Sequence, residues 1–110
     1  MNVVFSWEQI EAQIPEYEVF LTVDELNERT KELAARHPNV VEQSIIGQSR
    51  SGEPIYCLKI GRGKRQIVWF GCPHPNEPIG TLTIDFWAEF LAENTTLREE
   101  LDCTFYLVKC

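Results

Sequence analysis

The chain has 110 residues, of which 44% are hydrophobic and 25% are charged, a composition typical of one globular domain. Its 17 acidic residues against 10 basic ones give a net charge of -7, which disfavours binding to nucleic acid and to anionic membrane surfaces. The longest apolar run, residues 67–70, is far shorter than the roughly 20 residues of a membrane-spanning helix. The first twenty residues lack the basic and apolar segments of a signal peptide, so we expect a cytoplasmic protein.

The cysteine spacing matches neither a redox motif nor a zinc-ribbon motif. A reducing cytoplasm would also disfavour disulfides. We therefore expect small buried thiols at all four cysteines, which are Cys57, Cys72, Cys103 and Cys110.

The first half of the chain predicts a helix followed by a β-hairpin. Thr22 and Glu25 fit a capping box, and apolar side chains then recur at helical spacing, which predicts an amphipathic helix over residues 23–36. Its acidic residues are expected on a solvated face. Residues 40–46 and 54–60 then have strand composition, with turn-forming residues between them, and are predicted to pair as a hairpin.

The second half of the chain predicts a strand, a helix and another strand. Residues 66–72 are apolar without alternation, which indicates a central strand covered on both faces, entered from the preceding strand through a hairpin tip at residues 61–65. A helix from about Ile79 to Glu93 is predicted to pack its apolar face on the sheet and to leave Asp85 on its polar face. The apolar face of the helix includes Leu82, Phe86 and Phe90. After the helix, strand composition returns over residues 101–108, which completes a βαβ unit.

The segment between the central strand and the second helix contains the candidate functional residues. It lies at the carboxyl end of the strand, where ligands bind in open α/β sheets. His74 and Glu77 stand two residues apart, and three prolines restrict the backbone around them. An imidazole nitrogen and a carboxylate held in one turn could form half of a zinc site. The alternative is an ordinary turn, in which His74 bonds to the backbone and Glu77 favours a helix N-terminus.

Several segments in order resemble the zinc carboxypeptidase family of carboxypeptidase A. They are LTVDEL (21–26), IGQSRSGEPIY (46–56), PHPNEP (73–78) and FYLV (105–108). The resemblance covers about residues 20–110 and implies that residues 21–110 are the N-terminal portion of a catalytic domain, with residues 1–20 as an extension. In that family the H-x-x-E motif binds zinc, which implies His74 and Glu77 as ligands. Asn76, where relatives often carry a basic residue, is the candidate substrate-binding residue.

The same resemblance implies the fold of this portion and the absence of several active-site residues from it. The fold is α/β, a mixed β-sheet flanked by helices, with about four strands and two main helices in this portion. The family's third zinc ligand, general base and substrate-carboxylate clamp follow the last strand present here, so no catalytic residue is expected within this chain. We therefore expect the 110 residues alone to be inactive, and the missing C-terminal part of the domain to be needed for activity.

The implied function is a zinc metallocarboxypeptidase that hydrolyses the C-terminal bond of a peptide substrate. One alternative is a zinc amidohydrolase that acts on acylated amino acids, as enzymes of the desuccinylase and aspartoacylase type do. The other alternative is a non-enzymatic fragment that interacts through an exposed sheet edge.

Overall fold

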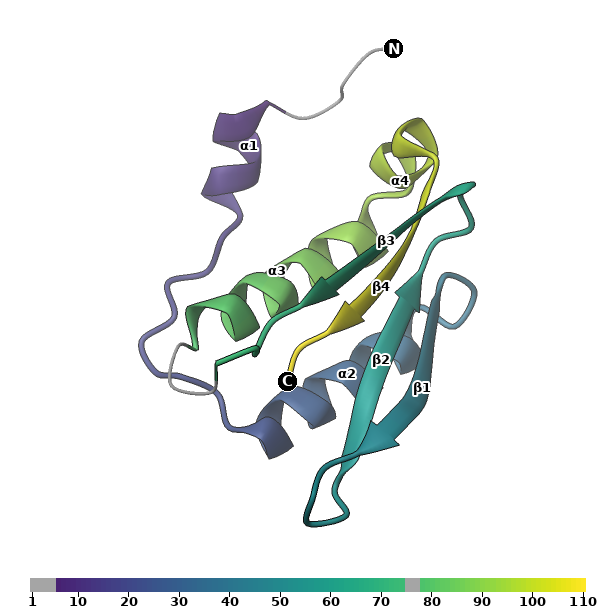
Figure 1. Ribbon diagram of the computed structural model, residues 1–110. Coiled ribbons are helices and arrows are strands. Elements are labelled where there is room, and N and C mark those ends of the chain that lie inside the picture. Colours follow the sequence, from purple (N-terminus) through teal and green to yellow (C-terminus); the bar gives the residue numbers. More distant parts are fainter. Residues whose placement is uncertain (1–5, 75–77) are drawn as a thin grey trace.

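Four strands form one mixed sheet in the computed structural model, which describes residues 6–74 and 78–110 (Figure 1). The strands lie in the order β1-β2-β4-β3. β2 is antiparallel to both β1 and β4, whereas β3 and β4 are parallel. The predicted α/β class and mixed sheet are thus confirmed. The strand bounds are β1 (Val41–Gln48), β2 (Pro54–Ile60), β3 (Arg65–Phe70) and β4 (Cys103–Val108).

Two long helices and two short ones accompany the sheet. α2 begins with the predicted capping box, in which the backbone N–H of Glu25 donates to Thr22 Oγ1 at 3.1 Å and that of Thr22 to Glu25 Oε1 at 3.0 Å. The short helices α1 and α4 were not expected from the sequence. No helix within the described ranges is long and apolar enough to cross a membrane. The helix bounds are α1 (Trp7–Ala12), α2 (Val23–Arg36), α3 (Ile79–Glu93) and α4 (Thr95–Leu101).

Helices α2 and α3 cover the same face of the sheet (Figure 1). Leu33 of α2, Leu91 of α3 and Phe105 of β4 are all at least 98% buried in one apolar core. On the opposite face, neighbouring residues of the four strands form one row across the sheet. In the order β1, β2, β4 and β3, the row consists of Glu42, Lys59, Tyr106 and Val68, so it changes from charged to apolar side chains. We call this side of the sheet the open face.

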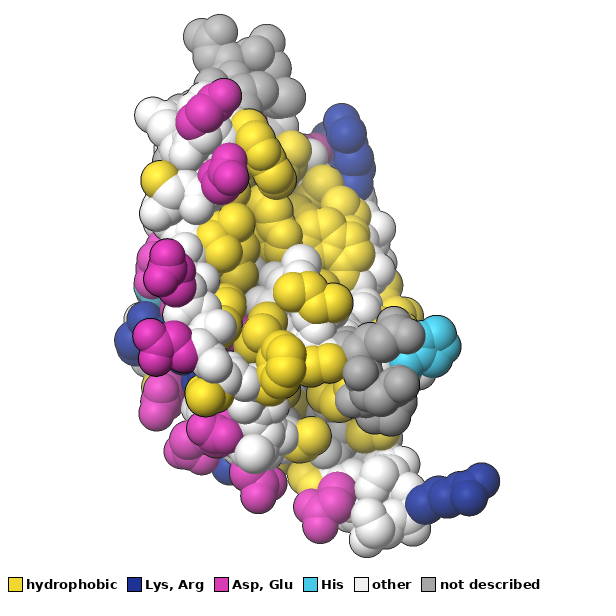
Figure 2. Space-filling view, turned by 90° about the vertical axis from the view of Figure 1, so that its left-hand side faces the viewer, with side chains coloured by type: hydrophobic (Ala, Val, Ile, Leu, Met, Phe, Trp, Pro, Cys, Tyr) yellow, Lys and Arg dark blue, Asp and Glu magenta, His cyan; other side chains and the backbone are white. Residues whose placement is uncertain are grey.

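β3 is the edge strand of the sheet, so the prediction of a central strand is wrong. β4 lies between β2 and β3, although it follows both in the sequence. In β3, Trp69 packs against the core, whereas Val68 is 55% exposed and Phe70 is 66% exposed. The apolar run therefore has alternate side chains in the core and alternate side chains exposed on the other face of the sheet. Figure 2 shows hydrophobic side chains gathered on the side of the molecule that presents this edge.

The connection between β2 and β3 is consequently not a hairpin tip. It crosses the start of β4, where the N–H of Gly63 donates to the Cys103 carbonyl at 3.3 Å and Thr104 Oγ1 donates to the Gly63 carbonyl at 2.7 Å. A Cβ at Gly63 would collide with the backbone of Asp102 and Cys103. The glycine thus allows this connection to pass directly over β4.

Truncation of Phe86 in α3 tests the packing of that helix. Its side chain is 92% buried and contacts the rings of Trp87 and Phe90, with centroids 5.4 and 5.6 Å away. Phe86→Ala should lower the free energy of unfolding by about 3 to 5 kcal/mol, as other large aromatic deletions from cores do. Urea denaturation followed by circular dichroism measures the loss. Glu93→Ala, at the exposed end of the helix, should cost under about 0.5 kcal/mol, and an equally small loss for Phe86→Ala would contradict the packing.

Candidate functional site

The candidate site is the stretch from Gly71 to Gly80, which joins β3 to the first turn of α3 at the carboxyl ends of the two parallel strands and of which residues 71–74 and 78–80 are described. We call it the site loop. Its first residue is bound to β4, because the N–H of Gly71 donates to the Val108 carbonyl at 2.8 Å. The hydroxyl of Thr81 donates to the Gly71 carbonyl at 3.3 Å. The beginning and the end of the loop are therefore fastened at the same place.

Two glycines permit this close approach at the base of the site loop. A Cβ at Gly80 would lie 2.5 Å from the Gly71 carbonyl oxygen. A Cβ at Gly71 would lie 2.7 Å from the Lys109 carbonyl oxygen. Real Cβ atoms do not approach backbone so closely, so any side chain at either position would force the loop base apart. The absence of side chains at both positions thus keeps the loop narrow at its base.

A disulfide between Cys72 and Cys110 joins the site loop to the segment after β4, with the Cα atoms 4.8 Å apart. The prediction of four thiols is therefore wrong for two of the four. The parallel register explains the pair: Phe70 lies opposite Val108, so the residues two positions further along are also neighbours. Cys57 and Cys103 are free and buried, as expected, and burial raises the pKa of the Cys57 thiol.

His74 lies on the site loop with an exposed side chain, two residues after the disulfide. His74 therefore does not lie in the core. Glu77 and Asn76 fall outside the described residues, which end at 74 and resume at 78. Glu77 as a metal ligand and Asn76 as a substrate-binding residue therefore stay predictions.

The described residues fit a zinc ion only in part. Within residues 6–74 and 78–110, no three His, Cys, Asp or Glu side chains are grouped as a metal site. The second histidine, His37, is the C-cap of α2, and its N–H donates to the Leu33 carbonyl. Catalytic zinc usually has three protein ligands. The described part of the chain therefore contributes one histidine, His74, to the site loop and does not by itself form a zinc site.

Asp85 of α3 forms a buried ionic cluster behind the site loop. The sequence predicted it on the polar face of the helix, but its side chain is 0% exposed. Arg29 of α2 donates to it through Nε and Nη2, at 2.9 and 2.7 Å, and Lys109 Nζ donates at 2.9 Å. The hydroxyl of Tyr17 donates at 3.3 Å. The cluster therefore joins α3 to α2, to the segment after β4 and to the N-terminal segment.

The burial and the charges of this cluster shift the pKa values of Asp85 and Tyr17. Burial alone would raise the pKa of Asp85, but the hydrogen bonds from Arg29 and the charge of Lys109 lower it below its ordinary value. Burial and the neighbouring Asp85 raise the pKa of Tyr17 to about 12. Because the Lys109 carbonyl borders Gly71, this cluster also fixes the strand end on which the site loop rests. No local sequence signal indicated it, since its members are far apart in the chain.

The cluster predicts a pH dependence of stability. Because the folded-state pKa of Asp85 is below its ordinary value of 3.8, its ionised form stabilises the fold above that pH, and this contribution disappears as the pH falls through the folded value. Asp85→Asn should destabilise the protein by about 3 to 5 kcal/mol at pH 7, since it leaves the buried Lys109 and the partly buried Arg29 without their carboxylate. Urea denaturation measures the free energy of unfolding of both proteins at pH 7 and at pH 2. The difference between the wild type and Asp85→Asn should be smaller at pH 2. A difference that does not change with pH would contradict this role of Asp85.

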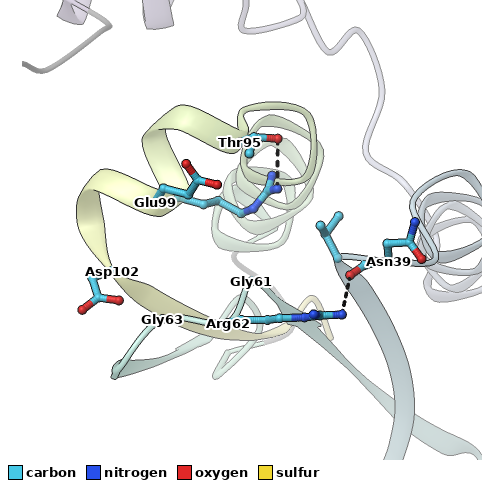
Figure 3. A pocket seen from close by; sticks show the side chains of 9 residues that line it. Asn39, Gly61, Arg62, Gly63, Thr95, Glu99 and Asp102 are labelled. Atoms are coloured by element: carbon cyan, nitrogen blue, oxygen red, sulfur yellow. Dashed lines mark hydrogen bonds between the residues drawn. The ribbon is translucent and has the colours of Figure 1, made fainter.

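A cavity of about 600 Å³ lies at the opposite end of the sheet from the site loop (Figure 3). Arg62 extends along its floor and donates to the Asn39 carbonyl at 3.2 Å. Arg98, 93% buried, donates to the Ala92 carbonyl at 2.9 Å and so binds the carboxyl end of α3. Burial lowers the pKa of Arg98. Glu99 also lines the cavity, so its charges are mixed and select no ligand.

A smaller cavity of about 220 Å³ lies directly beside the site loop. The Cys72–Cys110 disulfide lines it, together with Leu26 of α2 and Leu82 of α3. Pro78, at the start of α3, lines it as well. The cavity wall is mostly apolar, with Thr22 and Thr81 as its polar residues.

Comparison with known proteins connects this arrangement to a family. Residues 26–109 match the sequence profile of the zinc carboxypeptidase family. Carboxypeptidase A1 of Bos taurus is 38% identical over 55 residues, which are 48% of this chain and 13% of that protein.

Solved structures share the fold. The structure of bovine thrombin-activatable fibrinolysis inhibitor in complex with tick carboxypeptidase inhibitor matches 84% of this chain and 31% of its own, with a TM-score of 0.70 and 23% identity. Carboxypeptidase A from Helicoverpa armigera matches 82% of this chain and 24% of its own, with a TM-score of 0.62 and 19% identity. The chain thus spans less than a third of the length of each of these proteins.

Proposed function

Because this chain belongs to the zinc carboxypeptidase family, we propose that it forms the N-terminal part of a peptidase domain that hydrolyses C-terminal peptide bonds. The observation that carries the proposal is the family match over residues 26–109, which includes the site loop. The peptide C-terminus is the proposed substrate group, and Asn76 is proposed to contact it. The apolar wall of the cavity beside the site loop is compatible with a neighbouring peptide side chain.

Within this domain, His74 and Glu77 would be the zinc ligands from this part of the chain. A zinc ion held there would supply Lewis-acid chemistry, which would polarise a carbonyl group and lower the pKa of water at the site to about 7. The role of these 110 residues is to hold the ligands: β3 ends at the site loop, and Gly71, Gly80 and the disulfide fix its base. We infer that the third ligand, the general base and the groups that bind the substrate carboxylate come from protein outside this sequence.

The cellular location stays a prediction. We predicted a cytoplasmic protein, whereas the Cys72–Cys110 disulfide would persist best in an oxidising compartment. Fractionation of cells that produce the protein, with thiol alkylation before lysis, would measure both the location and the oxidation state of this cysteine pair.

We predict that the isolated chain binds zinc weakly and has no carboxypeptidase activity. Two ligands leave the ion largely hydrated, and a missing proton acceptor removes a contribution of typically 10² to 10⁴ in rate. Calorimetric zinc titration and mass spectrometry of a mixed peptide pool measure the two properties. Turnover that a chelator and Glu77→Ala both abolish would contradict the prediction of inactivity.

A chimera tests the proposed function itself. Residues 26–110, which contain the family match and the Cys72–Cys110 disulfide, would replace the corresponding part of Bos taurus carboxypeptidase A1, and the folded product would be assayed on peptides and on acylated amino acids. We expect C-terminal residues to be released from peptides, and the activity to be lost in His74→Ala and in Glu77→Ala. A folded chimera that is inactive, or that cleaves only acylated amino acids, would contradict the proposed peptidase.

A further inference from the structure

The outer edge of β3 presents a row of backbone hydrogen-bonding groups. The N–H groups of Arg65 and Gly71 donate to carbonyl groups in and beside β4, at 2.9 and 2.8 Å. Alternate residues of a strand bond to the same neighbour, so the even-numbered residues between these two direct their N–H and C=O groups away from β4. They are Gln66, Val68 and Phe70. In the part of the chain that the structure describes, no strand lies on that side of β3.

The side chains along this edge are apolar on both faces of the sheet. Val68 is 55% exposed and Phe70 is 66% exposed on the open face. On the core face, Ile67 and Trp69 are only partly buried, and the Trp69 ring lies 6.2 Å from the ring of Trp87. A partner that continues the sheet would therefore remove apolar surface from water on both faces.

We propose that β3 pairs with β3 of a second copy of this chain, antiparallel and with Val68 on the two-fold axis, so that the two sheets become one. The proposal goes beyond the proposed function and does not rest on it. In this register, each Val68 donates to and accepts from its counterpart, and Gln66 does the same with Phe70 of the second copy. Both core faces lie on the same side, where Ile67 meets Trp69 of the second copy.

The backbone and the charges of the edge select this register. An odd-numbered residue cannot lie on the axis, because its backbone groups already bond to β4. An axis at Phe70 would require pairing beyond the end of β3. An axis at Gln66 would make the two Arg65 side chains close neighbours of like charge. With Val68 on the axis, the two Arg65 residues lie about 20 Å apart, at roughly 3.4 Å per residue, which exceeds the Debye length of about 8 Å.

A second copy also fits the edge in charge and in symmetry. The basic side chains of Lys64 and Arg65 stand at the start of the strand and favour an acidic partner, and the chain itself has a net charge of -7. A two-fold interface uses the same surface on both molecules, so both rows of backbone groups are satisfied at once. Any other extended segment could use the same backbone groups, but its binding would not depend on Val68 meeting Val68.

Sedimentation equilibrium of the 110-residue chain tests the proposal. We expect the wild type to pass from monomer to dimer as its concentration rises through the micromolar range or above, because residues 66–70 form a small interface. Val68→Lys and Val68→Glu each place two like charges on the axis, and each should weaken association at least about 10-fold. An equal mixture of these two variants should associate as the wild type does, since opposite charges then meet on the axis.

A matched control replaces an apolar side chain of similar exposure on the other edge strand. Ile46 of β1 is 57% exposed, and Ile46→Lys should leave association unchanged. Circular dichroism of each variant checks that it is folded.

Amide hydrogen exchange, followed by nuclear magnetic resonance, locates the interface in the wild-type chain. In the monomer, the amides of Ile67 and Trp69 should exchange slowly, because they bond to β4, whereas those of Gln66, Val68 and Phe70 should exchange quickly. In the dimer, all five should exchange slowly. This measurement needs no variant, so it decides the proposal even if a substitution prevents folding.

The outcomes separate this dimer from other forms of association. A wild-type chain that stays monomeric up to about 1 mM overturns the proposal, since even weak specific pairs associate below that concentration. Association without slower exchange at Gln66, Val68 and Phe70 places the interface elsewhere and also overturns it. Slow exchange at these amides in the monomer would show that another segment of the chain occupies the edge. A mixture of the two Val68 variants that does not associate, or weakening by Ile46→Lys, contradicts the two-fold register.

Discussion

The parallel pairing of β3 with β4 is the constraint on which the rest of the structure depends. Parallel neighbours cannot be joined by a tight turn, so the chain crosses from one to the other through α3 and α4. This crossover packs α3 on the sheet. The same pairing brings the carboxyl ends of both strands to one edge, so that Cys72 meets Cys110 and the site loop begins beside the end of β4. The site loop is therefore positioned by the topology of the sheet.

The buried carboxylate of Asp85 gives α3 a defined position on this sheet. An ionised group in the core is costly unless charges and hydrogen bonds compensate it. Asp85 has Arg29 on one side and Lys109 on the other, and sliding α3 by one turn would separate it from both. Apolar contacts alone tolerate such a shift far better, because they have no direction. The cluster thus contributes specificity of packing between three segments.

Local signals in the sequence predicted the two long helices, because capping and periodicity act within a few residues. The bounds of α2 and the start of α3 follow from Thr22, Glu25 and Ile79. Strand order, the disulfide and the burial of Asp85 could not be predicted in this way, since each depends on residues brought together by the fold. The proline-rich segment after the strand indicated the site loop and His74, and the family resemblance added the role of zinc ligand. That role for His74 and Glu77, and substrate binding by Asn76, stay predictions.

Only part of the β3 edge carries features that oppose pairing with an additional strand. Lys64 immediately precedes the strand and Arg65 begins it, and charged side chains at a strand edge oppose the addition of another chain. Its second half has no charge, and Val68 and Phe70 are exposed there on the open face. Backbone hydrogen bonding by an approaching extended segment is therefore favoured at the Phe70 end. Such a segment would lie immediately beside the site loop.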